Sequence, residues 1–562
     1  MSPRTTVVRP VDPALRAALR LALLFAACKL AFHLAESLWE AHIGLGYYSD
    51  EMYYIMCGRH LAWGYVDHGP VVALQARLAE TLFGDSLAGI RLLSELGGTA
   101  RVFLTGILAW ALGGRRPAQG LAMFAVILPA QYLGVDGYLS MNSWESFFWM
   151  TCLLALILML RAAAAAPATA PQKGRALPRL WLLFGLSAGV GLLNKPSMLF
   201  FLFALVAGLL ATPQRHILAS RWAAAAATLT VLVTLPYLIW QAQHHWPTPE
   251  FLFNARAMHP ELLISHRVFV LVQLHDLGML LVPVWVAGLI HLLRRPRERW
   301  LGLVFVLFFL GMMAIRAKDY YVTPIYPVLF AAGGIAWERR FWASRRVLAD
   351  RVFAFPVYQA VIFAYALFTL PIALPVLPPA QWIAYTTAAR LYRPTPLVLK
   401  FIGPLPFFFA DRFGWQEEVN EVTRIYNSLP PERQKITGII CSNYGEASAI
   451  NFLGRGLPVA ISPRNNYYLW GTNGYTGDSM IVIAGISREK LLELASPTAF
   501  AANKDLVTPL DHATLSQYFD SVEVAGYMTS PYSSAYEHQD IYLVSGRKFD
   551  MAQVWPTVKS YF

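Results

Sequence analysis

Charged residues are scarce in this chain. Asp, Glu, Lys and Arg together make up 14% of its 562 residues, whereas hydrophobic residues make up 56%. The mean hydropathy is positive, and ordinary soluble domains do not show this combination. The composition therefore excludes a soluble globular protein and indicates a polytopic membrane protein.

Cysteine is scarce as well, with four residues in the whole chain. Their spacing is not that of a metal site, and Cys28 and Cys152 fall inside apolar stretches, where a thiol packs like a small hydrophobic side chain. No disulfide framework follows from them. The sequence also lacks a Walker loop, the nucleophile elbow of hydrolases and a dinucleotide fingerprint. Nothing in it supports nucleotide-driven chemistry.

Long apolar stretches dominate the sequence. Most are close to the ~20 residues that cross a bilayer. Two shorter apolar runs between residues 180 and 213 are separated by Asn194-Lys195-Pro196-Ser197. With that pair included, we expect about eleven transmembrane helices. The remaining stretches cover residues 17–37, 90–112, 118–134, 144–162, 222–240, 267–291, 300–316, 321–337 and 352–375.

The charges of the loops predict the orientation. The net charge of +12 is spread in short Lys and Arg clusters between the apolar stretches, which favours a membrane and not a nucleic acid as the partner. Threading the spans alternately places every cluster on one side, so the positive-inside rule predicts a cytoplasmic N-terminus. The apolar run from Leu19 to Phe32 has no convincing cleavage site, and we interpret it as a retained first helix.

The pattern after residue 375 changes to that of a soluble α/β domain. Short apolar runs at residues 436–440, 480–484 and 541–544 predict buried strands, and residues 444–452 predict a short helix. We therefore expect a transmembrane domain over residues 1–375 and an extracytoplasmic α/β domain over residues 376–562. An odd number of spans places this second domain outside.

Unusual polar residues gather in the loops assigned to the outer side. Asp50 and Glu51 follow the first apolar stretch, and adjacent carboxylates at a membrane interface are costly to desolvate. They belong either to a solvated loop or to a catalytic site facing a lipid-borne substrate. Asp67 and His68 form either a structural pair or part of that site. The run between the two groups has the spacing of a short helix along the membrane surface.

Lys195 interrupts an otherwise apolar hairpin. A charge in hydrocarbon costs ~2.5–3.5 kcal/mol by insertion scales, so the ammonium must reach the interface or find an anion. One interpretation is a snorkelling side chain, and the other is a ligand for a phosphate. Arg91, Arg316 and Lys318 are further candidates for the same anion, although Arg91 also suits an anchor at the start of the second span.

Several histidines, including His244 and His259, cluster after Trp240. Histidines near carboxylates bind divalent metals, so Asp67, His68, His244 and His259 are candidate ligands of one ion. No strict ligand spacing such as His-Glu-x-x-His occurs. A divalent metal and a purely structural role for these residues both remain open.

Five motifs, in this order along the chain, carry a family resemblance. They are Ser49-Asp50-Glu51-x-Tyr53-Tyr54, Gly64-Tyr65-x-Asp67-His68-Gly69-Pro70, Tyr138–Glu145, Leu193-Asn194-Lys195-Pro196 and Lys318-x-Tyr320-Tyr321-x-x-Pro324. With them the chain resembles the bacterial membrane glycosyltransferases related to protein O-mannosyltransferases and to the lipid A aminoarabinose transferase. The resemblance implies the GT-C fold, an all-α polytopic membrane domain followed here by the soluble α/β domain. It also implies a sugar donor on polyprenyl phosphate, used outside the bacterial cytoplasmic membrane.

The resemblance also implies roles for single positions. Asp50 matches the acidic residue proposed to activate the acceptor in such enzymes, and Glu51 is its neighbour. Where the aminoarabinose transferase has a Glu-Lys-Pro-Pro element, this chain has Asp67-His68-Gly69-Pro70, so a lysine contact is lost and Asp67 remains a candidate metal ligand. The positions that match the phosphate-holding residues of that transferase are Lys195, Lys318, Tyr320 and Tyr321.

The resulting hypothesis is an inverting glycosyltransferase. Asp50 removes a proton from the acceptor, and Lys195, with Arg91 or Lys318, neutralises the departing phosphate. The acceptor is lipid A, another glycan or a protein. A flippase or transporter of lipid-linked sugars instead predicts polar residues through the membrane depth and matching halves, and a non-catalytic scaffold does not require Asp50 or Lys195. Polar residues gathered on one side favour the transferase.

Overall fold

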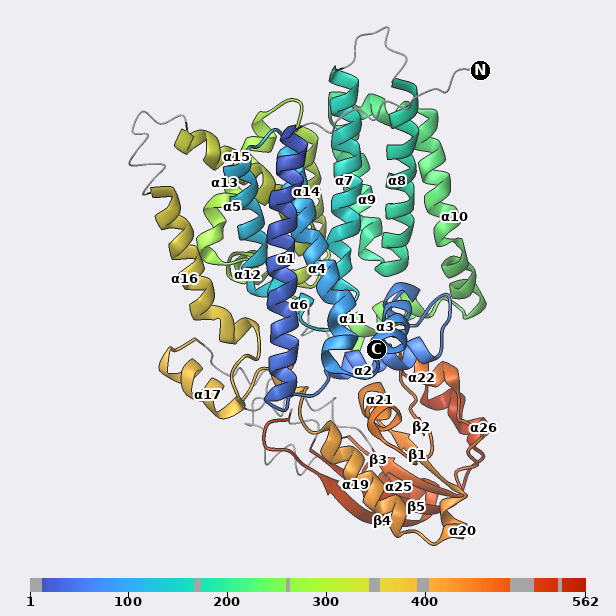
Figure 1. Ribbon diagram of the computed structural model, residues 1–562. Helices are drawn as coiled ribbons and strands as arrows, with labels where there is room; N and C mark the ends of the chain where they lie inside the picture. The colour runs from blue at the N-terminus through green and yellow to red at the C-terminus, as the bar shows by residue number, and fades with distance from the viewer. Residues whose placement is uncertain are drawn as a thin grey trace, which may run out of the picture.

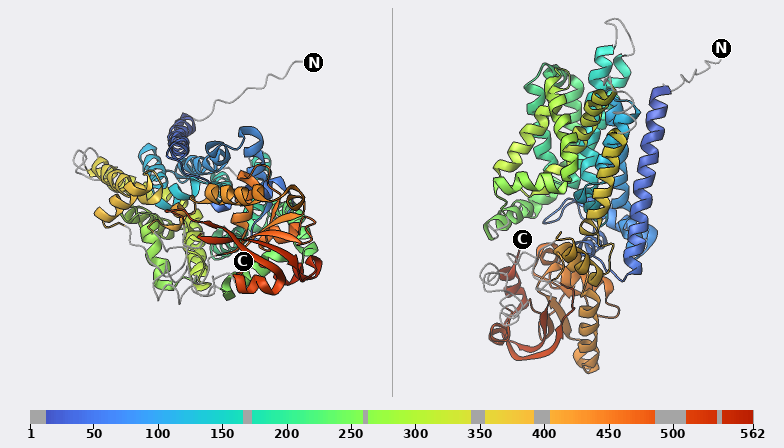
Figure 2. Two further views of the ribbon diagram at one scale, coloured as in Figure 1. Left: turned by 90° about the horizontal axis from the view of Figure 1, so that it is seen from below. Right: turned by 90° about the vertical axis from the view of Figure 1, so that its left-hand side faces the viewer.

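A computed structural model describes residues 13–165, 173–258, 263–342, 354–391, 404–485, 510–533 and 538–561. The protein has two layers (Figure 1): a bundle of long helices, and an α/β domain that packs against one end of it. Figure 2 shows the first helix of the bundle from end to end; it runs along the height of the bundle.

Six helices of the described chain are long and apolar enough to cross a membrane, and three bent helix pairs raise this number to nine. The shorter α14 (Arg299–Ala314) and α15 (Tyr326–Trp342) complete the set, so each of the eleven predicted apolar segments is helical. The single helices are α1 (Pro13–His42), α4 (Leu87–Ala111), α7 (Asn142–Ala165), α8 (Lys173–Asn194), α10 (Arg221–Gln243) and α16 (Phe355–Ala373). The bent pairs are α5 (Arg116–Ile127) with α6 (Ala130–Asp136), α9 (Ser197–Leu210) with η1 (Pro213–Ala219), and α12 (His266–Asp276) with η3 (Met279–Leu281) and α13 (Val282–Arg294).

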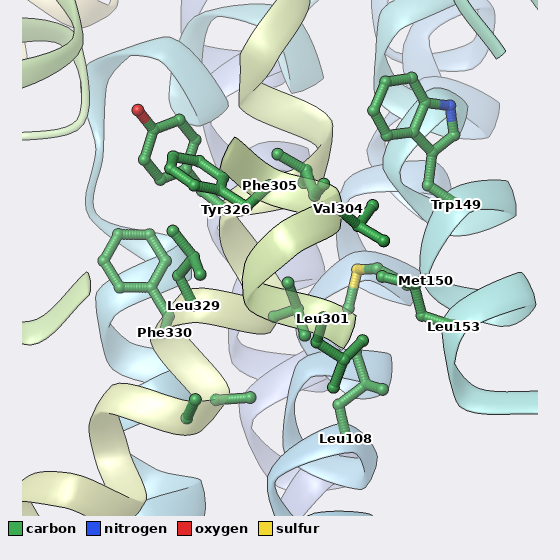
Figure 3. Packing of buried hydrophobic residues seen from close by; sticks show 14 of the residues in the cluster. Leu108, Trp149, Met150, Leu153, Leu301, Val304, Phe305, Tyr326, Leu329 and Phe330 are labelled. Atoms are coloured by element: carbon green, nitrogen blue, oxygen red, sulfur yellow. The ribbon is translucent and has the colours of Figure 1, made fainter. Parts of the chain in front are cut away.

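Aromatic and small residues hold the bundle together. The ring of Trp149 on α7 stacks on Phe201 of α9, with centroids 4.4 Å apart. Figure 3 shows Trp149 on the α7 side of a buried cluster that also contains residues of α14 and α15. Gly288 of α13 lies so close to α15 that a Cβ there would meet the carbonyl oxygen of Leu329 at 2.0 Å. A side chain at this position would therefore separate the two helices.

Short helices fill the junction between bundle and domain. The run after Asp50 is helical as predicted and forms α2 (Ser49–Arg59). With it lie α3 (Pro70–Phe83), α11 (Pro247–Met258) and the 3₁₀ segment η4 (Asp319–Ile325). Pro70 occupies the first turn of α3, where its missing N–H has no helical partner in any case.

The α/β domain contains one five-stranded sheet with the order β2-β1-β3-β5-β4. β1 pairs in parallel with β2 and β3, and β5 is antiparallel to β3 and β4. The strands are β1 (Thr437–Cys441), β2 (Ala460–Ile461), β3 (Ser479–Ile483), β4 (Phe519–Met528) and β5 (Gln539–Arg547). The helices that follow α16 along the chain are α17 (Pro379–Ala388), α18 (Phe407–Ala410), α19 (Trp415–Ser428), α20 (Pro431–Gln434), α21 (Tyr444–Leu453), α22 (Asn465–Trp470), α25 (His512–Tyr518), α26 (Met551–Val554) and η9 (Trp555–Val558).

The three predicted strands and the predicted helix are confirmed as β1, β3, β5 and α21. β2 and β4 were not predicted. β2 has only two residues, which is too short for a periodicity signal. β4 is an edge strand whose middle is largely exposed, so its sequence lacks the continuous apolar run of a buried strand.

Residues of both layers share a buried cluster. It includes Met52 and Ile55 of α2, Trp415 of α19 and Ala447 of α21. Polar contacts reinforce it: the backbone N–H of Val66 donates to Asn466 Oδ1 at 3.1 Å. The domain is thus packed on the short helices of the junction, which also carry the predicted site.

Candidate active site

Five separate parts of the chain carry the predicted site to the junction. They are the N-terminal turn of α2, the segment between α2 and α3, the segment between α6 and α7, the turn between α8 and α9, and η4. The α/β domain adds α21 and α22. The site is therefore built at one end of the bundle, where the loops of distant spans meet the domain (Figure 1).

Asp50 lies in the first turn of α2, half-buried, among tyrosines. The hydroxyl of Tyr444 donates to its Oδ1 at 3.0 Å. Tyr138 is close enough that the Asp50 charge, after burial, contributes to raising the pKa of that phenol to about 12. Burial and then Asp50 raise the pKa of Tyr444 well above its usual value. Both phenols are therefore protonated donors at neutral pH.

Asp67 and His68 lie beside a third tyrosine of the site, Tyr53. Tyr53 donates to Asp67 Oδ1 at 2.9 Å, and burial raises the pKa of Asp67. The His68 ring is fully buried and stacks on Tyr65, and burial lowers its pKa. Its Nδ1 lies 2.8 Å from the carbonyl oxygen of Gly69. A neutral imidazole donates that hydrogen bond, which leaves Nε2 as an acceptor 3.9 Å from Asp67.

Lys195 does not snorkel in this structure. Its ammonium is 2.9 Å from Glu145 Oε2 and 2.8 Å from Asn142 Oδ1, and the residue is only 6% exposed. Burial lowers the pKa of Lys195, but the Glu145 carboxylate outweighs it and the pKa is raised overall. Lys195 is a fixed, charged group on the turn between α8 and α9.

The two tyrosines of η4 form one wall of the lysine site. The Lys195 ammonium is 4.4 Å from the centre of the Tyr321 ring and 5.0 Å from that of Tyr320. Lys318 is exposed, and its ammonium lies 6.0 Å from the Tyr320 ring centre. The structure thus brings Lys195, Lys318, Tyr320 and Tyr321 together, as the motif order predicts.

Glu51 and Arg91 face a different environment. The Arg91 guanidinium donates from Nε and Nη2 to the two Glu51 oxygens, both at 2.8 Å, and also contacts Glu40. Backbone N–H groups of Leu139 and Tyr48 donate to Glu51 as well. Burial raises the pKa of Glu51, but Arg91 outweighs it and the pKa is lowered. Both side chains are fully buried and paired with each other, which favours structural roles. The catalytic role of Glu51 and the phosphate contact of Arg91 remain predictions.

The candidate metal ligands do not assemble among the described residues. The His244 ring stacks on Trp240, and its Nδ1 lies 2.8 Å from the Trp240 carbonyl oxygen. No group of three or more His, Cys, Asp or Glu side chains suited to an ion occurs in the described part of the chain. His259 lies outside the described residues. Asp67 and His68 alone do not make a ligand set, so we derive no step through a metal.

Sequence analysis missed a chain of buried charges along α1. Lys29 lies 3.0 Å from Asp136 of α6, which also binds Arg101, and Glu40 contacts both Arg91 and Arg412. The signal was present in the sequence. Lys29, His33, Glu36 and Glu40 are spaced by three or four residues and so share one face of a helix.

Comparisons with known proteins agree with this architecture. The family model for dolichyl-phosphate-mannose-protein mannosyltransferase matches residues 67–240, which is less than half of the chain. No curated protein has a matching sequence. Two crystal structures of ArnT from Cupriavidus metallidurans are similar over nearly all of both chains. The form bound to undecaprenyl phosphate has a TM-score of 0.57 at 14% identity and covers 93% of this chain and 97% of its own.

The chain has the fold of the GT-C membrane glycosyltransferases. The apo form of the same ArnT is similar to an equal degree, with a TM-score of 0.56, 14% identity, and 94% of this chain and 98% of its own covered. The fold that the resemblance implies is confirmed, and so are the helical membrane part and the C-terminal α/β part. The protein is a multi-pass membrane protein with a GT-C fold.

Proposed function

We propose that the protein is an inverting glycosyltransferase that moves a sugar from a polyprenyl monophosphate to an extracytoplasmic acceptor. One observation carries this proposal. The carboxylate of Asp50 and the ammonium of Lys195 lie at the same end of a GT-C bundle, in neighbouring tyrosine-lined environments. A transfer from a lipid phosphate needs both groups, a base for the acceptor and a cation for the leaving group.

The reaction follows from these two groups. An acceptor hydroxyl or amine attacks the anomeric carbon, and Asp50 takes its proton. The bond between the anomeric carbon and the phosphate oxygen breaks on the opposite face, and polyprenyl phosphate leaves. One displacement inverts the configuration. The lipid keeps the leaving group at the membrane surface throughout.

Lys195 stabilises the leaving phosphate. Its ammonium has three protons, and Glu145 and Asn142 are the two hydrogen-bond acceptors found among the described residues. The third proton serves the donor phosphate, and Lys318 adds a second, exposed charge. One well-placed contact of this kind stabilises a developing charge by ~3–4 kcal/mol. That the similar ArnT was crystallised with undecaprenyl phosphate supports this class of donor.

We place the protein in the bacterial cytoplasmic membrane, with a cytoplasmic N-terminus and the α/β domain outside, because the basic loop clusters favour that orientation. The acceptor is lipid A, another glycan or a protein. The test compares envelope glycans and lipids by mass spectrometry in cells with the gene, without it, and with Asp50→Asn in its place. Loss of the same sugar modification in the last two strains supports the proposal, and an unchanged envelope in all three contradicts it.

A transporter of lipid-linked sugars is the second candidate. The buried charges at Lys29, Asp136 and Arg101 favour it, because polar residues inside the bundle are typical of transporters. These charges are paired with one another, however, which also suits a purely structural role. The two functions differ in chemistry: a transporter moves the intact lipid-linked sugar across vesicles, whereas the transferase releases polyprenyl phosphate.

A further inference from the structure

The C-terminal α/β domain reaches the site through the first residue of α21, Tyr444. We propose that Tyr444 is a positioning residue for Asp50, so that the α/β domain completes the active site. This inference rests on the proposed function, because it assigns a role in the transfer reaction.

The contact between Tyr444 and Asp50 is specific. The phenol donates to Asp50 Oδ1 at 3.0 Å across 394 residues of sequence. The Tyr444 ring packs against Tyr53, with ring centres 4.5 Å apart, and Tyr53 in turn donates to Asp67. The packing against Tyr53 thus fixes the ring of Tyr444, and its hydroxyl points at the Asp50 carboxylate.

The start of α21 is built to hold this position. The Asn443 side chain accepts from the N–H groups of Gly445 at 2.8 Å and Glu446 at 3.0 Å. In return, the Glu446 carboxylate accepts from the backbone N–H of Asn443 at 3.2 Å. This reciprocal cap fixes the first turn of the helix, and therefore the Tyr444 side chain that projects from it.

The first turn of α2 is held against α21 from the other side. A Cβ on Gly445 would lie 3.1 Å from the Cβ of Ser49, so glycine permits the close approach of the two helix starts. The backbone N–H and the hydroxyl of Ser49 donate to Asp411 Oδ2 at 2.8 and 2.7 Å. Asp50 is the next residue. Ser49 and Asp50 are thus each hydrogen-bonded to the C-terminal part of the chain, Ser49 to Asp411 and Asp50 to Tyr444.

The hydrogen bond has a definite chemical consequence. A donor to one carboxylate oxygen restricts the rotation of the carboxylate and stabilises its charged form, which is the form a base needs. The other carboxylates near Tyr444 are Asp67 and Asp411, and both charges, with Asp50 and burial, keep the phenol protonated. Tyr444 remains a donor over the pH range in which Asp50 acts.

The test uses the full-length protein in lipid vesicles. The substrates are the polyprenyl-phosphate-sugar fraction and an envelope extract as the source of acceptor, both from cells that lack the gene. The readout is the initial rate of polyprenyl phosphate release across pH. Tyr444→Phe keeps the ring and removes only the hydroxyl. The matched control is Tyr426→Phe, which removes a hydroxyl on α19 of the same domain; that hydroxyl donates to the carbonyl oxygen of Gln434.

We expect Tyr444→Phe to lower the rate by about tenfold, the scale of a hydrogen bond to a charged group. The acid limb of the pH–rate profile should move to higher pH, because the charged form of Asp50 loses a donor. Tyr426→Phe should retain the wild-type rate and profile. In an Asp50→Asn background, the Tyr444→Phe effect should disappear, because the two residues act as a unit.

The outcomes separate the two proposals. Absence of polyprenyl phosphate release by the wild-type protein overturns the proposed function itself. A wild-type rate and pH profile in Tyr444→Phe, with an active wild-type protein, overturns only the role of Tyr444. A rate loss without a shift of the acid limb, or one that persists in the Asp50→Asn background, shows a structural role and also overturns it.

Discussion

Asp50 and Glu51 are adjacent carboxylates on α2, but their side chains lie in two different environments. Asp50 lies half-buried among tyrosines and accepts a hydrogen bond from a phenol. Glu51 is fully buried and is saturated by Arg91 and two backbone N–H groups. A carboxylate whose oxygens already accept hydrogen bonds from a guanidinium is not available to accept a proton from a substrate. Adjacent residues of the same chemistry therefore lie in different environments: that of Asp50 fits the proposed base, and that of Glu51 fits a buried ion pair.

The same comparison applies to the buried lysines. Lys29 lies inside the bundle beside Asp136 and Arg101, fully buried. Lys195 lies on a turn at the end of the bundle, between an acid and two aromatic rings. A buried charge in a membrane protein is thus no evidence of a substrate site by itself. Lys195 differs from Lys29 in its position at the end of the bundle, beside the residues that we propose hold the donor phosphate.

Asp50→Asn is the strongest test of the comparison. We expect the variant to fold as the wild-type protein and to lose transfer by about two to four orders of magnitude, the scale of a lost general base. Thermal unfolding of the purified variant and its transfer rate are the two measurements. Near-normal turnover would remove Asp50 from the reaction.

Glu51→Gln tests the other half of the comparison. The substitution leaves the Arg91 charge with a weaker partner in a buried site, and breaking a buried pair costs about 3–5 kcal/mol. We expect a large drop in the thermal unfolding midpoint and poor recovery of folded protein. A variant that is as stable as the wild-type protein but inactive would show that Glu51 is a catalytic residue.

Lys195→Ala should have an intermediate effect on transfer. If Lys195 contacts the phosphate mainly before reaction, the donor KM rises with kcat little changed, whereas a contact that strengthens as the phosphate departs lowers kcat as well. Removal of Lys195 also leaves Glu145 without its cation, so Lys195→Arg is the matched control, because it keeps the charge. Wild-type kinetics in Lys195→Ala would show that this lysine is structural.

Lys318→Ala should have the smallest effect. Its side chain is exposed, and exposed charge contacts contribute about 0–1 kcal/mol. We expect less than about a fivefold rise in donor KM, and a rise that shrinks as salt is added, because salt screens exposed charges. A loss as large as that of Lys195→Ala would mean that the two lysines share the phosphate equally.

Much of the fold could be predicted from the sequence, because apolar length and charge bias act locally along the chain. The helices of the bundle, three strands and α21 follow from such local patterns. The boundary at residue 375 remains a prediction. Contacts between residues that are far apart in the sequence could not be predicted in the same way. Arg91 has a charge that suits a phosphate. The structure shows that α1 and α2 lie close to Arg91, and that Glu40 and Glu51 on these helices bind its guanidinium.

The candidate site shows the same limit. The unusual character of Asp50 and Lys195 is visible in the sequence, because a charge beside or inside an apolar stretch needs an explanation. Tyr444 gives no such signal. It is one tyrosine in a soluble domain, and its role depends on a contact with a residue 394 positions away. Long-range hydrogen bonds of this kind require the three-dimensional structure.

The most direct measurement of the central claim is polyprenyl phosphate release by the purified wild-type protein in vesicles, beside Asp50→Asn under the same conditions. The vesicles contain the polyprenyl-phosphate-sugar fraction and an envelope extract as the source of acceptor. We predict that the wild-type protein releases polyprenyl phosphate and that the sugar appears on an acceptor with inverted configuration, whereas Asp50→Asn does neither at a comparable rate. Movement of the intact lipid-linked sugar across the bilayer without release, or equal release by both proteins, would contradict the claim.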